Sequence, residues 1–136
     1  MPVLASLPAA GSESSTGTVI TKEEGWLKRA VNSELIYPRF SILNPELAMT
    51  LPPFQVACGA MDISAHLMER YFTNVKNVSF TDRLIEGTLK TIMRQAPRIL
   101  ANPQDYDAWS EFMWAGTVAH NNLLNTGRVG DWASHD

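Results

Sequence analysis

The stretch from Pro52 to Phe72 constrains the fold most, because its apolar residues have the spacing of a long amphipathic helix. They recur at steps of three and four along the chain: Val56, Ala60, Ile63, Leu67 and Tyr71. This spacing places them on one face, which predicts a helix that packs against other elements. Pro52 and Pro53 suit its start, where a missing N–H costs nothing.

Two polar residues within this predicted helix are candidate metal ligands. Asp62 and His66 are four residues apart, so their side chains lie one turn apart on the same face. A carboxylate oxygen and an imidazole nitrogen placed in this way can bind one divalent cation, together with further ligands. Taken alone, the pair favours an ordinary solvated helix face, because such pairs are common on protein surfaces.

The sequence around this pair resembles that of a known family. Its shared motifs follow one another along the chain: Ser41-Ile42-Leu43-Asn44-Pro45, Thr50-Leu51-Pro52-Pro53, Val56-Ala57-Cys58-Gly59, and then Asp62, His66 and Glu69. They are similar to the signature of the iron-containing (group III) alcohol dehydrogenases, in the branch of butanol dehydrogenases and aldehyde reductases. The resemblance covers nearly the whole chain, with small departures at Asn44 and Ser64. It implies that Asp62 and His66 bind the catalytic metal.

The same resemblance implies a third metal ligand, His135, which follows Trp132-Ala133 near the end of the chain. One carboxylate and two imidazoles suit Fe²⁺ or Zn²⁺ and do not select between these ions. His120 lies on the apolar stripe of a later predicted helix, so we expect a hydrogen-bonded core histidine there and not a ligand. We expect no catalytic side chain beyond the metal ligands.

A second group of residues is implied to contact a nicotinamide cofactor, NADP or NAD. Residues 8–17 are rich in small and hydroxyl-bearing residues, and composition alone predicts a flexible linker there. The resemblance implies instead that residues 7–14 form the loop beside the nicotinamide. Its expected cofactor-binding residues are Ser6, Gly11, Ser12, Ser15 and Lys28. Lys28 is described equally well as an ordinary solvated lysine of a strand.

The order of the segments predicts an α+β chain. We expect short strands within residues 1–7 and 40–43, and a β-hairpin formed by residues 18–21 and 26–31. Three helices should follow: the first over residues 52–72, the second from residue 79 with a kink or an end at Pro97, and the third from Pro103, capped by Asn102, to a stop at Gly127.

The resemblance also implies how these segments divide between domains. Residues 1–44 would be the end of an α/β dinucleotide-binding domain, and residues 45–136 the first part of an all-helical metal-binding domain. This is the architecture that dehydroquinate synthase shares with the iron alcohol dehydrogenases. Asn44-Pro45 is expected to be the turn between the two domains.

Composition bears on the kind of partner. The chain has 136 residues, a net charge of −3 and 18% charged residues, without the charge excess of a nucleic-acid or membrane-surface binder. No apolar run approaches the length of a membrane span, and the first residues lack the basic leader of a signal peptide. One cysteine fits a reducing compartment. We therefore expect a cytoplasmic protein without nucleic-acid or membrane partners.

The resemblance implies a NAD(P)H-dependent, metal-assisted alcohol dehydrogenase or aldehyde reductase, acting on a small alcohol or aldehyde and dimeric in its full-length form. Because members of the family are far longer, we expect this chain to be an internal fragment that is inactive by itself. Two alternatives stay open. One is a non-catalytic helical metal-binding fragment or remnant, and the other is a glycerol dehydrogenase-like relative.

Overall fold

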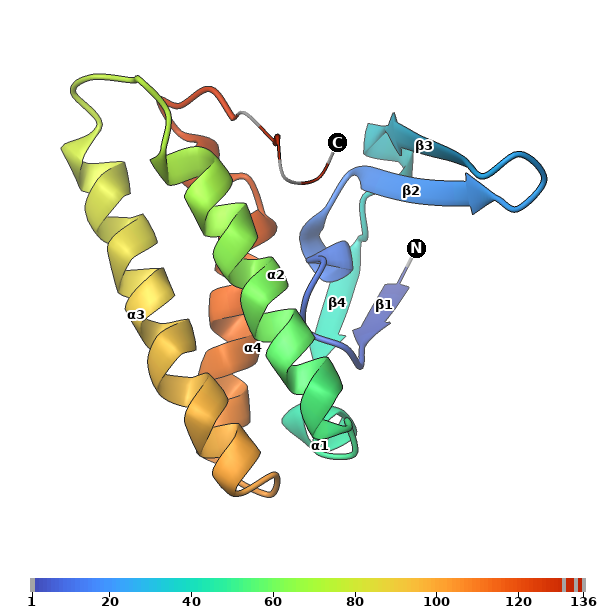
Figure 1. Cartoon of the computed structure of the whole chain (residues 1–136), viewed down its shortest axis with the longest axis vertical. Helices are drawn as coiled ribbons and strands as arrows, with labels where there is room; N and C mark the ends of the chain where they lie inside the picture. The colour runs from blue at the N-terminus through green and yellow to red at the C-terminus, as the bar shows by residue number, and fades with distance from the viewer. Residues whose placement is uncertain (1, 131, 134, 136) are drawn as a thin grey trace.

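Three long helices form one part of the molecule, and two small sheets form the other (Figure 1). The computed structural model describes residues 2–130, 132, 133 and 135. In chain order, the strands, helices and short 3-10 helices are β1 (Pro2–Ala5), η1 (Ser12–Ser14), β2 (Gly17–Lys22), β3 (Leu27–Asn32), η2 (Glu34–Ile36), β4 (Phe40–Leu43), α1 (Pro45–Ala48), α2 (Pro53–Tyr71), α3 (Ser79–Ala101), α4 (Tyr106–His120) and η3 (Leu123–Asn125). This order confirms the predicted α+β chain.

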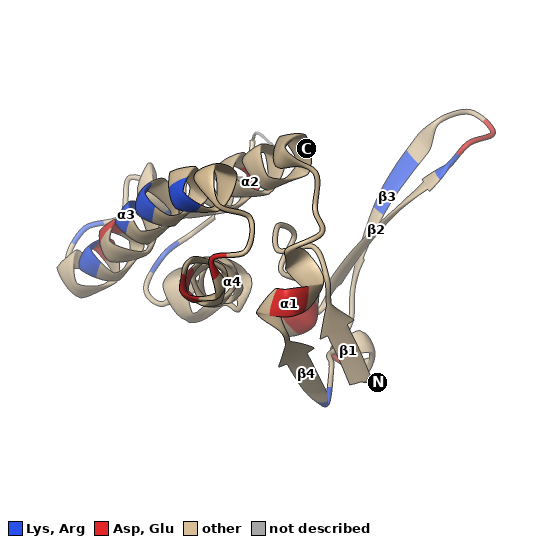
Figure 2. Ribbon diagram, turned by 90° about the horizontal axis from the view of Figure 1, so that it is seen from below, with Lys and Arg blue, Asp and Glu red and all other residues tan. Residues whose placement is uncertain are grey.

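The strands pair in two separate sheets. β1 lies parallel to β4, with Val3 opposite Ser41, and β2 pairs with β3 as an antiparallel hairpin. The hairpin projects away from the helices (Figures 1 and 2), and every residue of its two strands is exposed. Both the hairpin and the two short strands were predicted from β-branched residues and turn signals.

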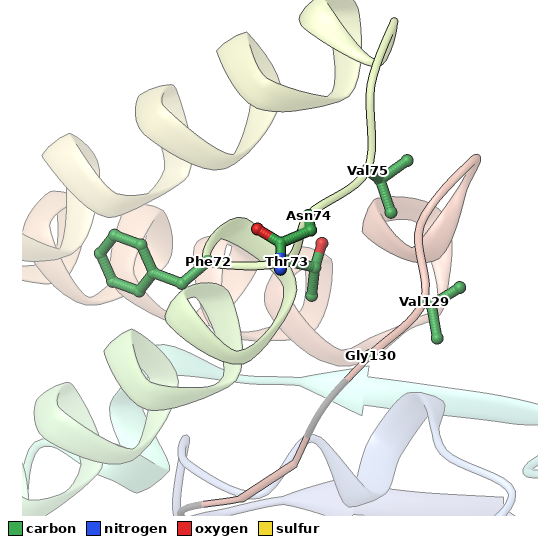
Figure 3. Close-up of a pocket in the computed structure, with 6 residues that line it drawn as sticks. All are labelled: Phe72, Thr73, Asn74, Val75, Val129 and Gly130. Carbon is green, nitrogen blue, oxygen red and sulfur yellow. The ribbon is translucent and has the colours of Figure 1, made fainter.

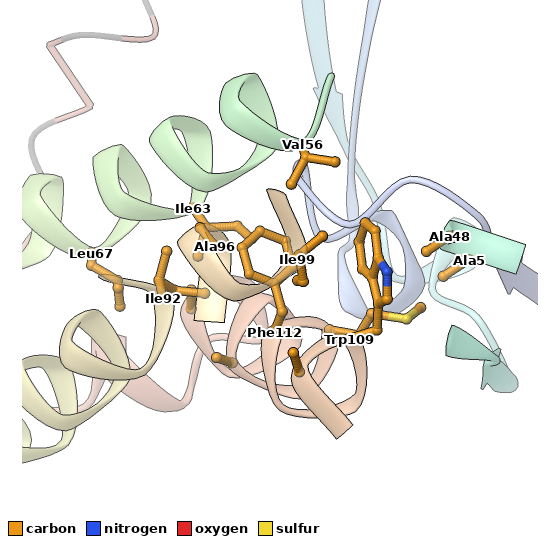
Figure 4. Close-up of a cluster of buried hydrophobic side chains, with 14 of the residues drawn as sticks. Ala5, Ala48, Val56, Ile63, Leu67, Ile92, Ala96, Ile99, Trp109 and Phe112 are labelled. Carbon is orange, nitrogen blue, oxygen red and sulfur yellow. The ribbon is translucent and has the colours of Figure 1, made fainter. Parts of the chain in front are cut away.

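The core lies between α2, α3 and α4, whose apolar faces meet (Figure 4). Trp109 and Phe112 of α4 are only 1% and 0% exposed, and Ile63 and Leu67 of α2 lie against the same cluster. The Trp109 indole N–H donates a hydrogen bond to the Pro103 carbonyl oxygen, at 2.9 Å. Burying each such large apolar side chain contributes about 1.5–3 kcal/mol. The apolar spacing of α2 therefore predicted its buried face correctly.

The sequence predicted a kink or an end of the second helix at Pro97. An end there is wrong, because α3 continues through Pro97 to Ala101, while the kink stays a prediction. Proline removes one backbone donor, and the carbonyl four residues earlier belongs to Met93. Both residues are exposed, so water can replace the missing hydrogen bond. On the opposite face Ile92 and Ile99 are buried, and their packing holds the helix together across the proline.

The third long helix begins later than predicted, at Tyr106 and not at Pro103. Asn102 is instead the C-cap of α3, and Asp105 is the N-cap of α4, where its side chain accepts a hydrogen bond from the Ala108 N–H. Arg98 forms an ion pair with Asp105 at 2.8 Å, which favours the later cap. The helix also ends earlier than predicted, at His120.

The turn predicted at Asn44-Pro45 is the start of the short helix α1. The Asn44 side chain accepts a hydrogen bond from the Glu46 N–H at 3.1 Å, and Pro45 occupies the first helical position. Within the described part of the chain, no helix has the length and apolarity that crossing a bilayer requires.

Candidate metal centre

The structure brings the three predicted metal ligands together. Asp62 and His66 lie one turn apart on α2, and His135 reaches them from the segment that follows η3. The ring of His135 stacks on that of His66, with centroids 4.7 Å apart and planes 12° apart. One ligand atom of each of the three residues lies within 4.8 Å of the others.

These distances are close to those that a single divalent ion requires. Two ligands with metal bonds of about 2.1 Å can be at most about 4.2 Å apart. Asp62 Oδ1 and His135 Nε2, at 3.7 Å, already meet this limit. His66 is 4% exposed, and its Nδ1 is buried without a hydrogen-bond partner among the described residues. A buried polar atom of this kind is costly unless a partner such as an ion satisfies the ring.

Burial keeps the candidate ligand His66 neutral. Burial, with smaller contributions from the neighbouring His135 and Arg70, lowers the pKa of His66 to about 4. Near neutral pH the imidazole therefore carries no proton on one of its nitrogens, which leaves a lone pair for a metal. The donor set of one carboxylate and two imidazoles is the mixed oxygen and nitrogen type that Fe²⁺ and Zn²⁺ accept.

Two charged residues that sequence reasoning did not assign support this cluster. Glu69 is 9% exposed, and its Oε1 lies 3.2 Å from His135 Nδ1. Arg70 is 1% exposed and donates from Nη1 to the His66 carbonyl oxygen and from Nε to Asn125 Oδ1, each at 2.6 Å. Both residues follow His66 by about one helical turn, so their spacing could have placed them on the ligand-bearing face.

Arg70 also connects α2 to the segment that carries His135. Its guanidinium lies 4.6 Å from the centroid of the Trp132 ring, a cation–π arrangement. Burial lowers the pKa of Arg70 to about 10, so the side chain stays protonated at neutral pH. Its burial was not predicted, because an arginine in a helix is normally exposed.

The loop that precedes β2 packs against α2 and α4, so the flexible linker predicted from its composition is wrong. Gly11 is buried with φ of 61°, and a Cβ added there would lie 2.5 Å from the Cβ of His120. A Cβ added at Gly59 of α2 would lie 2.6 Å from the carbonyl oxygen of Pro8. Glu13 Oε1 accepts a buried hydrogen bond from Thr117 Oγ1 at 2.7 Å.

The predicted cofactor-binding residues lie on or near this loop, with varied surroundings. Ser6 and Ser12 are exposed, and Ser15 Oγ accepts a hydrogen bond from the Gly17 N–H at 2.9 Å. Lys28, on β3, donates from Nζ to the carbonyl oxygen of His135 at 2.9 Å. The loop and the hairpin thus border the metal centre, while the contacts of these residues with a cofactor stay a prediction.

His120 is not the hydrogen-bonded core histidine that its position on the apolar stripe predicted. Its Nδ1 is buried and has no hydrogen-bond partner in the described part of the chain. Its ring centroid lies 4.4 Å from that of His66. Burial, followed by the nearby His66, lowers the pKa of His120 to about 4, so this ring is also neutral. His120 therefore packs between the loop and the metal centre.

A separate surface hollow lies at the end of α2 (Figure 3). It is lined by Phe72, Thr73, Asn74, Val75, Val129 and Gly130. None of the predicted metal or cofactor residues lines it, so it does not belong to the metal centre.

Comparisons with known proteins agree with this arrangement. Residues 56–136 match the family model of the Fe-containing alcohol dehydrogenase family, C-terminal part. The NADPH-dependent aldehyde reductase YqhD of Escherichia coli (strain K12) is 40% identical over 135 residues, which are 99% of this chain and 35% of that protein. A probable NADH-dependent butanol dehydrogenase of Bacillus subtilis (strain 168) is 37% identical over 96% of this chain and 34% of its own length.

Solved structures give the same result. The crystal structure of Escherichia coli K-12 YqhD matches with a TM-score of 0.94 and 40% identity, over 97% of this chain and 34% of that one. The NADH-dependent butanol dehydrogenase A of Thermotoga maritima matches with a TM-score of 0.94 and 35% identity, over 98% of this chain and 34% of that one. The chain thus spans about a third of the length of these relatives. It belongs to the Fe-containing alcohol dehydrogenase family.

Proposed function

We propose that this chain carries part of the active site of a nicotinamide-dependent alcohol dehydrogenase or aldehyde reductase, with a small alcohol or aldehyde as substrate. The observation that carries the proposal is the contact between the loop of residues 8–15 and the helix that bears Asp62 and His66. In this arrangement a nicotinamide on the loop and a metal ion on the helix would lie side by side. The names of the related enzymes, an aldehyde reductase and butanol dehydrogenases, support the substrate class.

In this proposal Asp62, His66 and His135 hold Fe²⁺ or Zn²⁺, which would polarise the oxygen of the bound alcohol or aldehyde. The loop around Gly11 and Ser12 holds the nicotinamide end of NADP or NAD. In alcohol oxidation the hydride leaves the carbinol carbon for the nicotinamide and the hydroxyl proton leaves to solvent; reduction is the reverse. The chain contributes mainly by fixing the distance between the two reacting carbons.

The same proposal assigns the two parts of the chain to two domains of the full-length protein. Residues 1–44 would end a dinucleotide-binding domain, and residues 45–136 would begin a helical metal-binding domain. A homodimer and a cytoplasmic location are part of the same proposal.

The test combines metal analysis with an activity assay. The full-length protein, purified and supplied with Fe²⁺ or Zn²⁺, should bind metal and oxidise NADPH or NADH in the presence of butyraldehyde, followed by the loss of cofactor absorbance. Asp62→Ala should lose both properties, because it removes a charged ligand. Glu111→Gln, on the exposed side of α4, is the matched control and should retain both.

Two results would decide against the proposal. Full metal occupancy in Asp62→Ala would remove Asp62 from the metal centre. Metal bound by the unsubstituted full-length protein without any turnover would favour the alternative of a non-catalytic metal-binding piece.

A further inference from the structure

We propose that Glu69 is a positioning residue that orients the ring of His135 so that its Nε2 faces the metal. The proposal rests on the metal centre described under the proposed function. The two nitrogens of the His135 ring face different carboxylates: Nδ1 lies 3.2 Å from Glu69 Oε1, and Nε2 lies 3.7 Å from Asp62 Oδ1. One carboxylate is therefore placed to support the ring and the other to share an ion with it.

The Glu69 contact selects one tautomer of His135. A carboxylate accepts a hydrogen bond, so the proton of the neutral imidazole must be on Nδ1 for this contact to be favourable. Nε2 then carries the lone pair, and Nε2 is the nitrogen on the side of Asp62. A carboxylate that holds the second nitrogen of a ligand histidine fixes the ring orientation and strengthens the metal bond.

The place of His135 in the fold explains why it needs this support. His66 is carried by the long helix α2, so its ring is held by the packing of a rigid element. His135 lies beyond the last helical turn, η3, outside any helix, and its contacts include a ring stack on His66, an edge contact with the Trp132 ring and the exposed hydrogen bond from Lys28. Glu69 lies on α2, three residues after His66, and its side chain is 7% exposed. One rigid helix thus holds a ligand and orients the next.

The first experiment measures the tautomer without any metal. In ¹⁵N-labelled, metal-free protein, two-dimensional ¹⁵N–¹H correlation of the imidazoles should show His135 with its proton on Nδ1. In Glu69→Ala the proton should move mainly to Nε2, the form that free histidine prefers. Glu69→Gln keeps an oxygen acceptor without the charge and should be intermediate. A purely structural role of Glu69 would not change the tautomer of one ring.

The second experiment measures zinc affinity by competition with a chromophoric chelator. Glu69→Ala should raise the zinc dissociation constant about 10–100-fold, the usual range for a residue that supports a ligand histidine. Glu69→Gln should raise the zinc dissociation constant less, and Glu111→Ala, on the exposed side of α4, should leave it unchanged. Circular dichroism shows which variants are folded. If Glu69→Ala does not fold, the zinc dissociation constant of Glu69→Gln tests the proposal in its place.

The outcomes separate this proposal from the one it rests on. An unchanged tautomer, or an unchanged zinc dissociation constant in a folded Glu69 variant that binds zinc, overturns the role of Glu69 and leaves the metal centre intact. If the unsubstituted protein binds no zinc, the metal centre itself is wrong, and the role of Glu69 at that centre is overturned with it.

Discussion

The helical part of the molecule and the hairpin differ in how their residues are held. In α4, Trp109 and Phe112 are 1% and 0% exposed. In the segment around the hairpin, Trp26 and Leu35 are 81% and 94% exposed. Apolar burial is the main favourable term in folding, so the helices are held by their own core and the hairpin is not. Side chains on the helices are therefore held in fixed positions, while the hairpin extends away from the core and is held less firmly.

The loop of residues 8–15 shows how the two parts are joined. It has no core of its own, but it is held against α4 by two contacts. Gly11 packs on His120, and the Glu13 carboxylate accepts a hydrogen bond from the Thr117 hydroxyl. The loop therefore takes its position from the helical part. Candidate cofactor residues on this loop are held more firmly than Lys28 on the exposed hairpin.

Truncation of the helical core should have the largest effect on stability. Trp109→Ala removes a fully buried indole and should lower the free energy of unfolding by about 3–5 kcal/mol. Trp26→Ala, which truncates an exposed indole, should change it by less than about 0.5 kcal/mol. Urea denaturation followed by circular dichroism measures both. Equal losses for the two tryptophans would mean that the hairpin has a core of its own.

Acid should also weaken the helical part. The pKa of His66 and of His120 is about 4 in the folded protein, against an ordinary value of 6.5. Between these values the unfolded chain binds more protons than the folded chain. The free energy of unfolding of the metal-free protein should therefore fall as the pH drops from 6.5 to 4, by up to about 1.4 kcal/mol per pH unit for each histidine.

This pH dependence is measured by urea titrations at a series of pH values in the presence of a metal chelator. His120→Leu removes one of the two groups and should reduce the slope by about half. It should leave the amount of bound metal unchanged, because His120 is not a predicted ligand. A flat pH dependence in the unsubstituted protein would show that the two rings are not buried as neutral imidazoles.

A side chain at Gly11 should disturb the joint between the two parts. Gly11→Ala places a methyl group against His120, at a left-handed φ that costs a non-glycine residue about 1–3 kcal/mol. We expect a loss of this size in the free energy of unfolding and, under the proposed function, weaker binding of the nicotinamide cofactor, measured as a higher dissociation constant. Gly87→Ala is the control, since nothing lies within 4 Å of its added Cβ, and it should be neutral or stabilising.

A double substitution separates the two causes. Adding His120→Gly to Gly11→Ala removes the Cβ of His120, which would lie 2.5 Å from the new methyl group, but keeps the backbone cost, so part of the loss should return. Full additivity of the two substitutions would show that Gly11 and His120 do not contact each other.

Lys28→Met should have the smallest effect. Its hydrogen bond to the His135 carbonyl oxygen is exposed, so its contribution is less than about 1 kcal/mol. The zinc dissociation constant should therefore rise less than about fivefold, and the tautomer of His135 should not change. A larger effect than that of Glu69→Ala would mean that the hairpin, and not α2, positions His135.

Local patterns predicted those parts of the fold in which neighbouring residues decide the outcome. The spacing of apolar residues at steps of three and four predicted α2 and placed Asp62 and His66 on one face of it. The β-branched residues predicted the hairpin. The path of α3 through Pro97 depends on Ile92 and Ile99, which are buried against other helices. No local pattern contains that packing, so the sequence favoured a break there.

The candidate site shows the same limit. The family resemblance pointed to Asp62, His66 and His135, and the structure places them together. The supporting contacts join residues far apart in the chain: Glu69 with His135, and Glu13 with Thr117. Such pairs form only when the helices pack, so spacing along the sequence does not reveal them.

The close approach of Gly59 to the Pro8 carbonyl oxygen bears on how accurately this site is built. Backbone lies directly on backbone there, with no flexible side chain to absorb an error. A methyl group at position 59 would lift the loop away from the metal-bearing helix. A displacement of about 1 Å can slow a reaction about 100-fold. In the proposed full-length enzyme, such a change would slow hydride transfer, measurable as a larger deuterium isotope effect, without weakening the binding of either reactant.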